Sequence, residues 1–556
     1  MIFINKYYGL ILVLILSFWA IKPLFVNGFF PMHDDTQVAR VFEMGKALRD
    51  GMFPVRWVPD LGYGYGYPIF NFYAPLSYYF GGFLTLLGFD ALLATKIMMA
   101  VGILLSGVFM YLLAREFWGV LGGILSGLFY VYAPYHALDI YVRGDVAEFW
   151  AYAFVPLMFW GFYKVFKDPR WKWVIVGSLG YAGIILSHNL TAMMVTPFLA
   201  IVTLLYCYIA YRNKKLFTIY YLLFTILLGL MISAFYWIPA LLEMKYTNVL
   251  SQIGGGADFR DHFVCIRQLW DSHWGFGGSA SGCIDGLSFK IGKLHIILSL
   301  ISIISAILFL RKRREKIWLI VLLSIGFILS VFLTLEISRP IWEALPLVEF
   351  LQYPWRFLLI ASFFASLLCG VIFLKLDRKI KYVVIISVVF LLIFFNSRIF
   401  NPQTIFSRVA LDYTNEKYLR WTISKISDEY LPRDFVKPNN KDEVPNAIIV
   451  PELGDSKIAI ESLKTHSISI ITNQTDDTNF LINIAYFPAW KIFVDGKEKP
   501  FKVLNSRISI HIPSGKHKID LKFQETLLEK TSNAISLLGI SMIIIGIIKF
   551  RSKVNK

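Results

Sequence analysis

The sequence predicts a polytopic α-helical membrane protein that carries a β-rich domain close to its C-terminus. Hydrophobic residues make up 56% of its 556 residues, and the mean hydropathy of +0.59 is too high for a soluble domain of this length. About twelve apolar stretches approach the roughly 20 residues that a helix needs to cross a bilayer. After residue 396 the chain becomes polar and strand-like before one last apolar stretch.

These apolar stretches set the predicted domain organisation. The predicted spans are 9–27, 91–113, 119–135, 149–166, 173–190, 191–210, 216–238, 294–310, 317–335, 356–374, 381–396 and 533–549. We therefore expect a transmembrane domain over residues 1–396, a β-sandwich-like domain over 397–531, and a final span with a basic tail over 532–556.

The basic residues fix the predicted topology. Lysine and arginine cluster in alternate connections between spans, as at 164–172, 311–316, 375–381 and 551–556. By the positive-inside rule these connections are cytoplasmic, so both termini are expected in the cytoplasm of a multi-pass cell-membrane protein. The net charge of +17 then reflects contact with the lipid bilayer, and we expect no nucleic-acid partner.

The segments that join these spans on the other side are expected outside the cell. They are the loops 28–90, 136–148, 239–293 and 336–355, together with the region 397–531. Residues 74–87 are apolar, but a span there would invert every later basic cluster, so we expect an interfacial or re-entrant segment. Cys265 and Cys283 share one outer loop, where a disulfide is permitted but not required.

The outer C-terminal region has the pattern of a small β-sandwich. Short strands are predicted at 447–450, 467–472, 480–485, 491–494, 507–512 and 516–522. Asp495-Gly496 is a two-residue hairpin signal, and Pro513-Ser514-Gly515 marks another turn.

The first outer loop contains a predicted helix followed by a glycine–tyrosine repeat. Apolar residues recur at helical spacing over 36–50, which predicts an amphipathic helix lying along the membrane and ended by Gly51. After it comes the repeat Leu61-Gly62-Tyr63-Gly64-Tyr65-Gly66-Tyr67-Pro68. Its glycines allow close approach of the backbone, and its tyrosines offer flat aromatic faces. Tyr65 and Tyr67 are therefore candidates to bind a sugar.

Two adjacent acids, Asp34 and Asp35, precede this helix and are the candidate catalytic residues. A carboxylate there suits a general base for a hydroxyl, or a ligand for a divalent cation such as Mg²⁺ or Mn²⁺. Either acid could instead cap the helix that starts near Thr36. His33 and Arg40 are candidates to contact a phosphate, against ordinary roles as a surface group and an ion-pair partner.

Further candidate substrate-binding residues lie in the other outer loops. Arg143, Asp145 and Glu148 bring three charges to the start of a predicted span, where helix capping and an internal ion pair are the alternative. His188 lies in a tight external hairpin and faces protein or a cavity rather than lipid.

Tyr353 and Arg356 begin another span at its outer end. The Arg356 guanidinium suits a phosphate, whereas snorkelling toward lipid headgroups is the alternative. Ionisable residues are rare at mid-depth in the spans, which favours chemistry at the membrane surface over ion-coupled transport.

Several motifs carry a family resemblance. They are Gly51-Met52-Phe53-Pro54-Val55-Arg56-Trp57, the glycine–tyrosine repeat, Asn71-Phe72-Tyr73-Ala74-Pro75-Leu76, Arg143-Gly144 with Glu148, and Tyr486-Phe487-Pro488-Ala489-Trp490 with the strand after it. Together they resemble the bacterial membrane proteins labelled 6-pyruvoyl-tetrahydropterin synthase-related, the YfhO-like proteins and, more distantly, the GT-C glycosyltransferases.

The resemblance implies a GT-C-like enzyme that transfers a sugar from a polyprenyl-phosphate carrier to a glycan, lipid or protein acceptor of the cell envelope. Asp34 or Asp35 would be the catalytic acid of the first loop, and Arg143, His188 and Arg356 would be the carrier-phosphate ligands. The two acids are adjacent and not separated by one residue, so the resemblance does not fix metal dependence. A non-catalytic lipid or polysaccharide translocator and an envelope-assembly scaffold are the alternatives.

Overall fold

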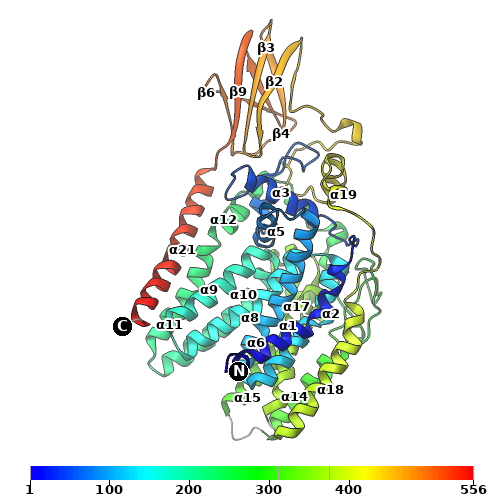
Figure 1. The fold of residues 1–556 in the computed structure, drawn as a ribbon, viewed down its shortest axis with the longest axis vertical. Coiled ribbons are helices and arrows are strands. Elements are labelled where there is room, and N and C mark those ends of the chain that lie inside the picture. The colour runs from blue at the N-terminus through cyan, green and yellow to red at the C-terminus, as the bar shows by residue number, and fades with distance from the viewer. Residues whose placement is uncertain (1, 310–313, 375, 555–556) are drawn as a thin grey trace.

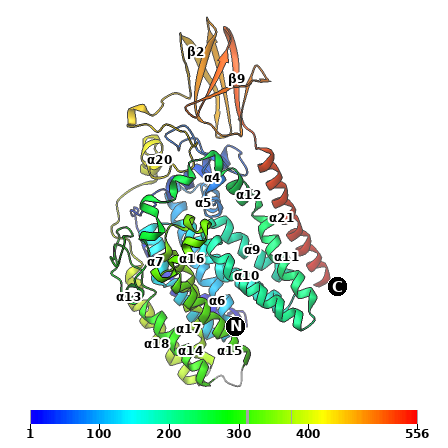
Figure 2. The ribbon, with the colours of Figure 1, turned by 180° about the vertical axis from the view of Figure 1, so that it is seen from behind.

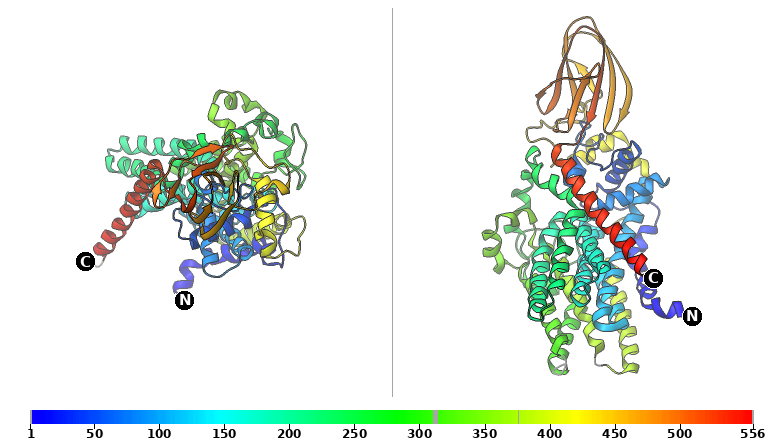
Figure 3. Two further views of the ribbon diagram at one scale, coloured as in Figure 1. Left: turned by 90° about the horizontal axis from the view of Figure 1, so that it is seen from above. Right: turned by 90° about the vertical axis from the view of Figure 1, so that its left-hand side faces the viewer.

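The computed structural model describes residues 2–309, 314–374 and 376–554, and it consists of a long helical bundle with a β-sandwich above one end (Figure 1). The same two layers are seen from behind (Figure 2). Both termini lie toward the end of the bundle away from the sandwich (Figures 1 and 3). Residue 310 of the predicted span 294–310 and the basic residues Arg311, Lys312, Arg313, Lys375 and Lys556 lie outside the described residues.

The helices of the bundle and its loops have the following bounds: α1 (Ile2–Leu16), α2 (Phe18–Ile21), α3 (Gln37–Arg49), α4 (Ile69–Phe72), α5 (Leu76–Leu86), α6 (Ala91–Val131), α7 (Pro134–Leu138), α8 (Val146–Lys167), α9 (Trp171–Ser187), α10 (Asn189–Arg212), α11 (Leu216–Ile232), α12 (Ala234–Leu242), α13 (Ile266–Trp270), α14 (Lys293–Phe309), α15 (Arg314–Phe332), α16 (Arg339–Ala344), α17 (Leu358–Cys369), α18 (Arg378–Asn396), α19 (Ala410–Thr414), α20 (Ser424–Ile426) and α21 (Leu527–Val554).

A helix or a run of helical turns covers the described part of each of the twelve predicted spans. Within the described residues, seven helices are long and apolar enough to cross a membrane, or up to eight if the bent pair α11 and α12 is one span. The polytopic helical membrane fold is therefore confirmed, whereas the number twelve and the cytoplasmic placement of both termini stay predictions.

Helix α6 contains two predicted spans that fold back on each other. As one straight helix its 41 residues would measure about 60 Å, about twice the hydrocarbon thickness. Instead, Gly119 adopts φ 76° and ψ −174°, and a Cβ placed on Gly127 would lie 3.1 Å from the carbonyl oxygen of Gly107. The two halves are thus antiparallel neighbours joined at a residue whose conformation is essentially restricted to glycine.

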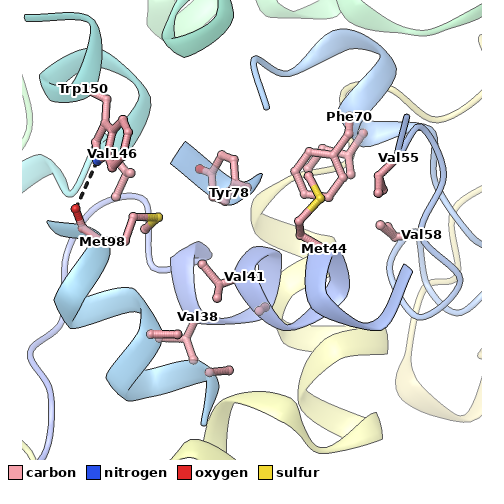
Figure 4. Close-up of a cluster of buried hydrophobic side chains, with 14 of the residues drawn as sticks. Val38, Val41, Met44, Val55, Val58, Phe70, Tyr78, Met98, Val146 and Trp150 are labelled. Carbon is pink, nitrogen blue, oxygen red and sulfur yellow. Dashed lines mark hydrogen bonds between the residues drawn. The ribbon is translucent and has the colours of Figure 1, made fainter. Parts of the chain in front are cut away.

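The predicted helix over 36–50 is present as α3 (Gln37–Arg49), and most of its residues are buried against other parts of the protein; its placement along the membrane stays a prediction. Figure 4 shows its apolar residues inside a packed cluster, which includes Val38, Val41, Met44, Phe70, Tyr78 and Met98. Polar residues of α3 are buried as well, among them Arg40 and Glu43. Helix α5 and the chain near residue 427 cover α3, and the amphipathic pattern of the sequence does not by itself show these long-range contacts.

The segment 74–87 forms α5, which packs against α3. Its 11 residues span only about 16 Å, so it does not cross the bilayer, as expected. The two helices approach closely at Gly82, where a Cβ would lie 2.6 Å from Met44 Cγ.

The C-terminal β-rich region is confirmed, and its strands form two antiparallel sheets. One sheet has the order β1-β4-β8-β7 and the other β2-β3-β9-β5-β6. The strands are β1 (Ile449–Pro451), β2 (Ser456–Lys464), β3 (Ser467–Gln474), β4 (Thr478–Ala485), β5 (Trp490–Val494), β6 (Lys497–Glu498), β7 (Lys502–Leu504), β8 (Arg507–Ile512) and β9 (Gly515–Phe523). The sequence missed β2, β6 and β7, whose residues are largely exposed and carry little apolar alternation. The exact domain boundaries and the extracytoplasmic placement stay predictions.

Two tertiary links fix the outer loops. Cys265 and Cys283 form a disulfide with a Cα–Cα distance of 5.5 Å. Arg56 of the first loop is buried, and its guanidinium donates to Asn71 Oδ1 at 2.6 Å, Glu525 Oε1 at 3.2 Å and Asn533 Oδ1 at 2.8 Å. Arg56 therefore joins the first loop to the end of the sandwich and to α21.

The turn at Gly119 generates a stability prediction. Gly119→Ala should destabilise the protein by about 1–3 kcal/mol, because a Cβ is strained in this backbone region. The matched control is Gly278→Ala, where nothing lies within 4 Å of an added Cβ and no positive φ strains it. Thermal unfolding of the two variants in detergent micelles measures the difference, and equal melting temperatures would contradict the strained turn.

Candidate functional site

The candidate site is a polar cavity of about 260 Å³ at the end of the bundle that faces the sandwich, where α3 lies (Figure 1). Segments far apart in the sequence contribute to it, including the starts of α3, α8 and α10 and the chain after α20. Its walls are formed by Asp34, Thr36, Arg40, Tyr73, Ala74, Asp145, Ala147, His188, Asn189, Leu190, Val249, Gln252, Phe350, Gln352, Arg356, Ile426, Ser427, Glu429 and Tyr430.

Backbone pairing between the first and second outer loops places Asp34 in this cavity. The Asp34 N–H donates to the Arg143 carbonyl at 2.9 Å, and Gln37 Nε2 donates to the Gly144 carbonyl at 2.8 Å. Gly144 has φ +65°, and a Cβ there would collide with Met32. The glycine of the Arg-Gly pair is therefore what allows the loops to meet.

Arg143 is the centre of a buried ion network behind the cavity. It donates to Asp139 Oδ1 at 2.5 Å, Asp145 Oδ2 at 2.8 Å and Glu148 Oε2 at 2.9 Å. The Tyr135 hydroxyl donates a short hydrogen bond to the other Glu148 oxygen. Arg143 does not line the cavity, so it organises these acids and is not free to bind a phosphate.

Asp145, Glu148 and His188 form a compact group of possible metal ligands. One ligand atom from each lies within 4.8 Å of the others, and all three residues are buried. His188 Nδ1 is hydrogen-bonded to the Thr191 hydroxyl at 2.8 Å, which orients the ring and leaves Nε2 for a ligand. Mixed carboxylate and imidazole donors suit a divalent cation.

Two arginines line the cavity itself. Arg356 is 6% exposed, and its Nε and Nη1 have no hydrogen-bond partner; the nearest described carboxylate oxygen, on Glu148, is 3.9 Å from Nε. Arg40 donates to Ser427 Oγ at 3.0 Å, and its guanidinium carbon lies 4.1 Å from the centre of the Tyr73 ring. Buried unpartnered donors are rare in folded proteins, so Arg356 is the group best placed to receive an anion.

The carboxyl groups of the site outnumber its arginines. Asp34, Asp139, Asp145, Glu148 and Glu429 line the cavity or its ion network, against Arg40, Arg143 and Arg356. With every group ionised, the excess is two negative charges. One divalent cation, or two protons, would balance it.

Burial shifts the ionisation of these outer-loop acids. Burial raises the pKa of Asp34, and the neighbouring Asp145 raises it further against the opposing charge of Arg143. Burial also raises the pKa of Glu429, opposed by Arg40. For Asp145 the effect of burial is outweighed by His188, Arg143 and Arg356, which hold its pKa below the usual range. Asp34 thus favours the proton-accepting role of a base, whereas Asp145 stays ionised.

Several predicted site residues lie outside this cavity. His33 is exposed, and its Nε2 lies 3.0 Å from the Phe276 carbonyl. Asp35 is absent from the cavity wall and lies near Arg408. Tyr353 stacks on Trp355.

The tyrosines of the repeat also lie outside it. Tyr67 is fully buried, with its hydroxyl 3.3 Å from Ser427 Oγ. Tyr65 lines a separate cavity next to the sandwich. Asp34, Arg40, Asp145, His188 and Arg356 are the predicted residues that meet in one place.

The sequence analysis missed the part of the wall that follows α20. Ser427, Glu429 and Tyr430 come from the region assigned to the β-domain and close the cavity over Arg40. These residues belong to no recognisable sequence motif. Their place in the cavity wall depends on a contact with α3, which lies nearly 400 positions earlier in the chain. Gln352 was also missed as a wall residue, although it directly precedes the predicted site residue Tyr353.

Two family models match different parts of the chain. The family model described as "6-pyruvoyl-tetrahydropterin synthase related domain; membrane protein" matches residues 70–401. The model of the bacterial membrane protein YfhO matches residues 448–536. An uncharacterized protein of Lactococcus lactis subsp. cremoris is 27% identical over 245 residues, which are 42% of this chain and 39% of the relative.

Solved structures resemble the chain more weakly. The oligosaccharyltransferase of Archaeoglobus fulgidus in the apo form has 12% identity and a TM-score of 0.43, covering 71% of this chain and 56% of that chain. ArnT from Cupriavidus metallidurans, bound to undecaprenyl phosphate, has 11% identity and a TM-score of 0.32, covering 66% of this chain and 78% of that chain. Because the first family model covers more than half of the chain, the chain belongs to the family of membrane proteins described as 6-pyruvoyl-tetrahydropterin synthase related.

Proposed function

We propose that the chain is a membrane glycosyltransferase that transfers a sugar from a polyprenyl-phosphate carrier to a glycan, lipid or protein acceptor at the outer face of the cell membrane. One observation carries the proposal: Asp34 shares its cavity with Arg356, whose buried Nε and Nη1 have no hydrogen-bond partner. A base for an incoming hydroxyl and a cation for a leaving phosphate are thus close together.

The helices around the cavity favour an anionic group. Helices α8 and α10 begin at residues that line it, and α17 begins just after Arg356. Helix N-termini carry partial positive charge and free N–H groups, which suit phosphate. A carrier phosphate would therefore lie between Arg356 and these helix starts.

The same helices lead to an apolar cleft. Phe159 of α8, Phe198 of α10 and Phe363 of α17 line a cavity of about 80 Å³ together with residues of α15. A larger groove of about 760 Å³ lies between α8, α10, α11 and α15 nearer their basic ends. An isoprenoid chain attached to a phosphate at the helix starts would find apolar surface along these helices.

The reaction needs one proton acceptor and one stabilised leaving group. An acceptor hydroxyl attacks the anomeric carbon while the bond from that carbon to the phosphate oxygen breaks, which inverts the configuration. Asp34 takes the hydroxyl proton, and Arg356 donates to the departing phosphate. Asp145, Glu148 and His188 would hold a divalent cation, which would offset the charge that develops on the phosphate.

The first prediction separates the two adjacent acids. Asp34→Asn should lower transfer from a polyprenyl-phosphate sugar at least about 100-fold, because a general base contributes roughly that much. Asp35→Asn is the matched control and should keep most activity, since Asp35 does not line the cavity. Mass spectrometry of defined lipid-linked saccharides after incubation with the purified protein measures both. Full activity of both variants would reject the enzyme and favour a translocator or a scaffold.

The second prediction concerns the divalent cation. Adding Mg²⁺ or Mn²⁺ to chelator-treated protein should raise its melting temperature, because a ligand that binds only the folded state stabilises it. Asp145→Asn should abolish this shift, whereas Asp455→Asn, an exposed acid of the sandwich, should keep it. A melting temperature unaffected by either metal would exclude the cation and leave two protons to balance the site.

The third prediction uses the environment of Asp35. Burial raises its pKa to about 6, against the opposing charge of Arg408. The folded protein therefore binds this proton more tightly than the unfolded chain does, and ionisation costs stability as the pH rises from about 4 to about 6. Asp35→Asn should raise the melting temperature more at about pH 8 than at about pH 4. An equal shift at both values would contradict the buried carboxyl.

A further inference from the structure

The glycine–tyrosine repeat of the first loop builds a second cavity, which the proposed transfer reaction does not use. This cavity of about 70 Å³ lies between the repeat and the sandwich. Two tryptophans, Trp57 and Trp490, line it together with the polar residues Lys46, Asp60, Arg420 and Asn483. It therefore combines residues from the first loop, α3, the segment before α20 and both sheets.

The glycines of the repeat are what bring two of these side chains to the cavity. Gly64 has φ +78°, and a Cβ there would lie 2.9 Å from Arg420 Cδ. Gly66 has φ +80°, and a Cβ there would collide with the Trp57 ring. Both positions thus need a residue without a side chain, for backbone conformation and for close approach.

The cavity wall contains hydrogen-bond donors that the protein itself does not satisfy. Trp490 is 1% exposed, and its Nε1 has no partner among the described residues; the same is true of Arg420 Nε. The amide of Asn483 has a partner at each end, because Nδ2 donates to the Ala447 carbonyl at 2.7 Å and Oδ1 accepts from Arg507 at 3.3 Å. Buried donors without partners point to a ligand that offers acceptor oxygens.

The aromatic residues add a matching apolar surface. The rings of Trp57 and Trp490 are 5.5 Å apart at 86° to each other, and Tyr65 closes a further side of the cavity. The free volume of about 70 Å³ corresponds to about five water-sized groups, which is enough for one edge of a sugar ring and its hydroxyl groups and less than a whole hexose. A saccharide has C–H faces for such rings and hydroxyl or carboxylate oxygens for the donors.

We propose that this cavity is a saccharide-binding site that takes one edge of a sugar unit of a glycan, with Arg420 Nε and Trp490 Nε1 donating to its oxygens. The site goes beyond the proposed transfer reaction, because it needs none of Asp34, Asp145 or Arg356. It lies next to the first cavity: Tyr67 of the repeat contacts Ser427, which lines that cavity. A glycan held here would extend along the outer surface beside the catalytic residues.

The test is binding of methyl glycosides of hexoses, N-acetylhexosamines and hexuronic acids to the full-length protein in nanodiscs, followed by saturation-transfer NMR. We expect at least one of these classes to bind. Arg420→Gln should weaken that binding about tenfold, which corresponds to about 1.4 kcal/mol. The matched control is Arg433→Gln, an exposed arginine outside the cavity, which should bind like the unchanged protein. The class that binds best then shows whether the donors of the cavity bind a neutral hydroxyl oxygen or a carboxylate oxygen of the sugar.

A second variant distinguishes loss of the binding site from misfolding of the protein. Leu463 lines the same cavity but is 58% exposed, so Leu463→Trp should block the cavity while leaving the melting temperature unchanged. Asp145→Asn should abolish transfer and keep saccharide binding, which separates failure of this site from failure of the proposed enzyme. Absence of binding by every class, or equal binding by Arg420→Gln, Leu463→Trp and Arg433→Gln, would overturn the proposal.

Discussion

The buried ion network around Arg143 is the interaction on which the rest of the site depends. One guanidinium holds three carboxylates from the second loop and the start of α8, and its backbone carbonyl holds the first loop through the Asp34 N–H. Arginine stays protonated in proteins, so this centre keeps its charge across the physiological pH range. Removing one partner of a buried ion pair typically costs about 3–5 kcal/mol, and here several carboxylates would be left unpaired.

This arrangement divides the work between two arginines that look equivalent in the sequence. Arg143 and Arg356 each precede the start of a helix, α8 and α17, and both suit phosphate recognition by residue type. Arg143 donates hydrogen bonds to acids of its own chain, whereas Arg356 has two buried nitrogens without hydrogen-bond partners. The first arginine holds the acids of the site in place, and the second leaves donors free for the anion that the proposed reaction requires.

The sequence predicted the helical segments and the residue types at their outer ends, because length and apolar character alone specify a helix in lipid. It also predicted Asp34, Asp145, His188 and Arg356 as site residues, because ionisable groups at the ends of membrane helices commonly face a cavity or a partner rather than lipid. It did not separate Asp34 from Asp35, because the orientation of adjacent side chains in a loop depends on backbone pairing with residues 142–144. Nor did it find Glu429, whose place follows from a long-range contact between α3 and the chain after α20.

The link from Arg56 to Glu525 and Asn533 has a consequence for biosynthesis. Glu525 and Asn533 follow Arg56 by 469 and 477 positions in the sequence, so Arg56 leaves the ribosome long before these two acceptors exist. Until residues 525–529 are made, Arg56 lacks both of the acidic partners that it has among the described residues. Docking of α21 onto the first loop is therefore a late step in the biosynthesis of this fold.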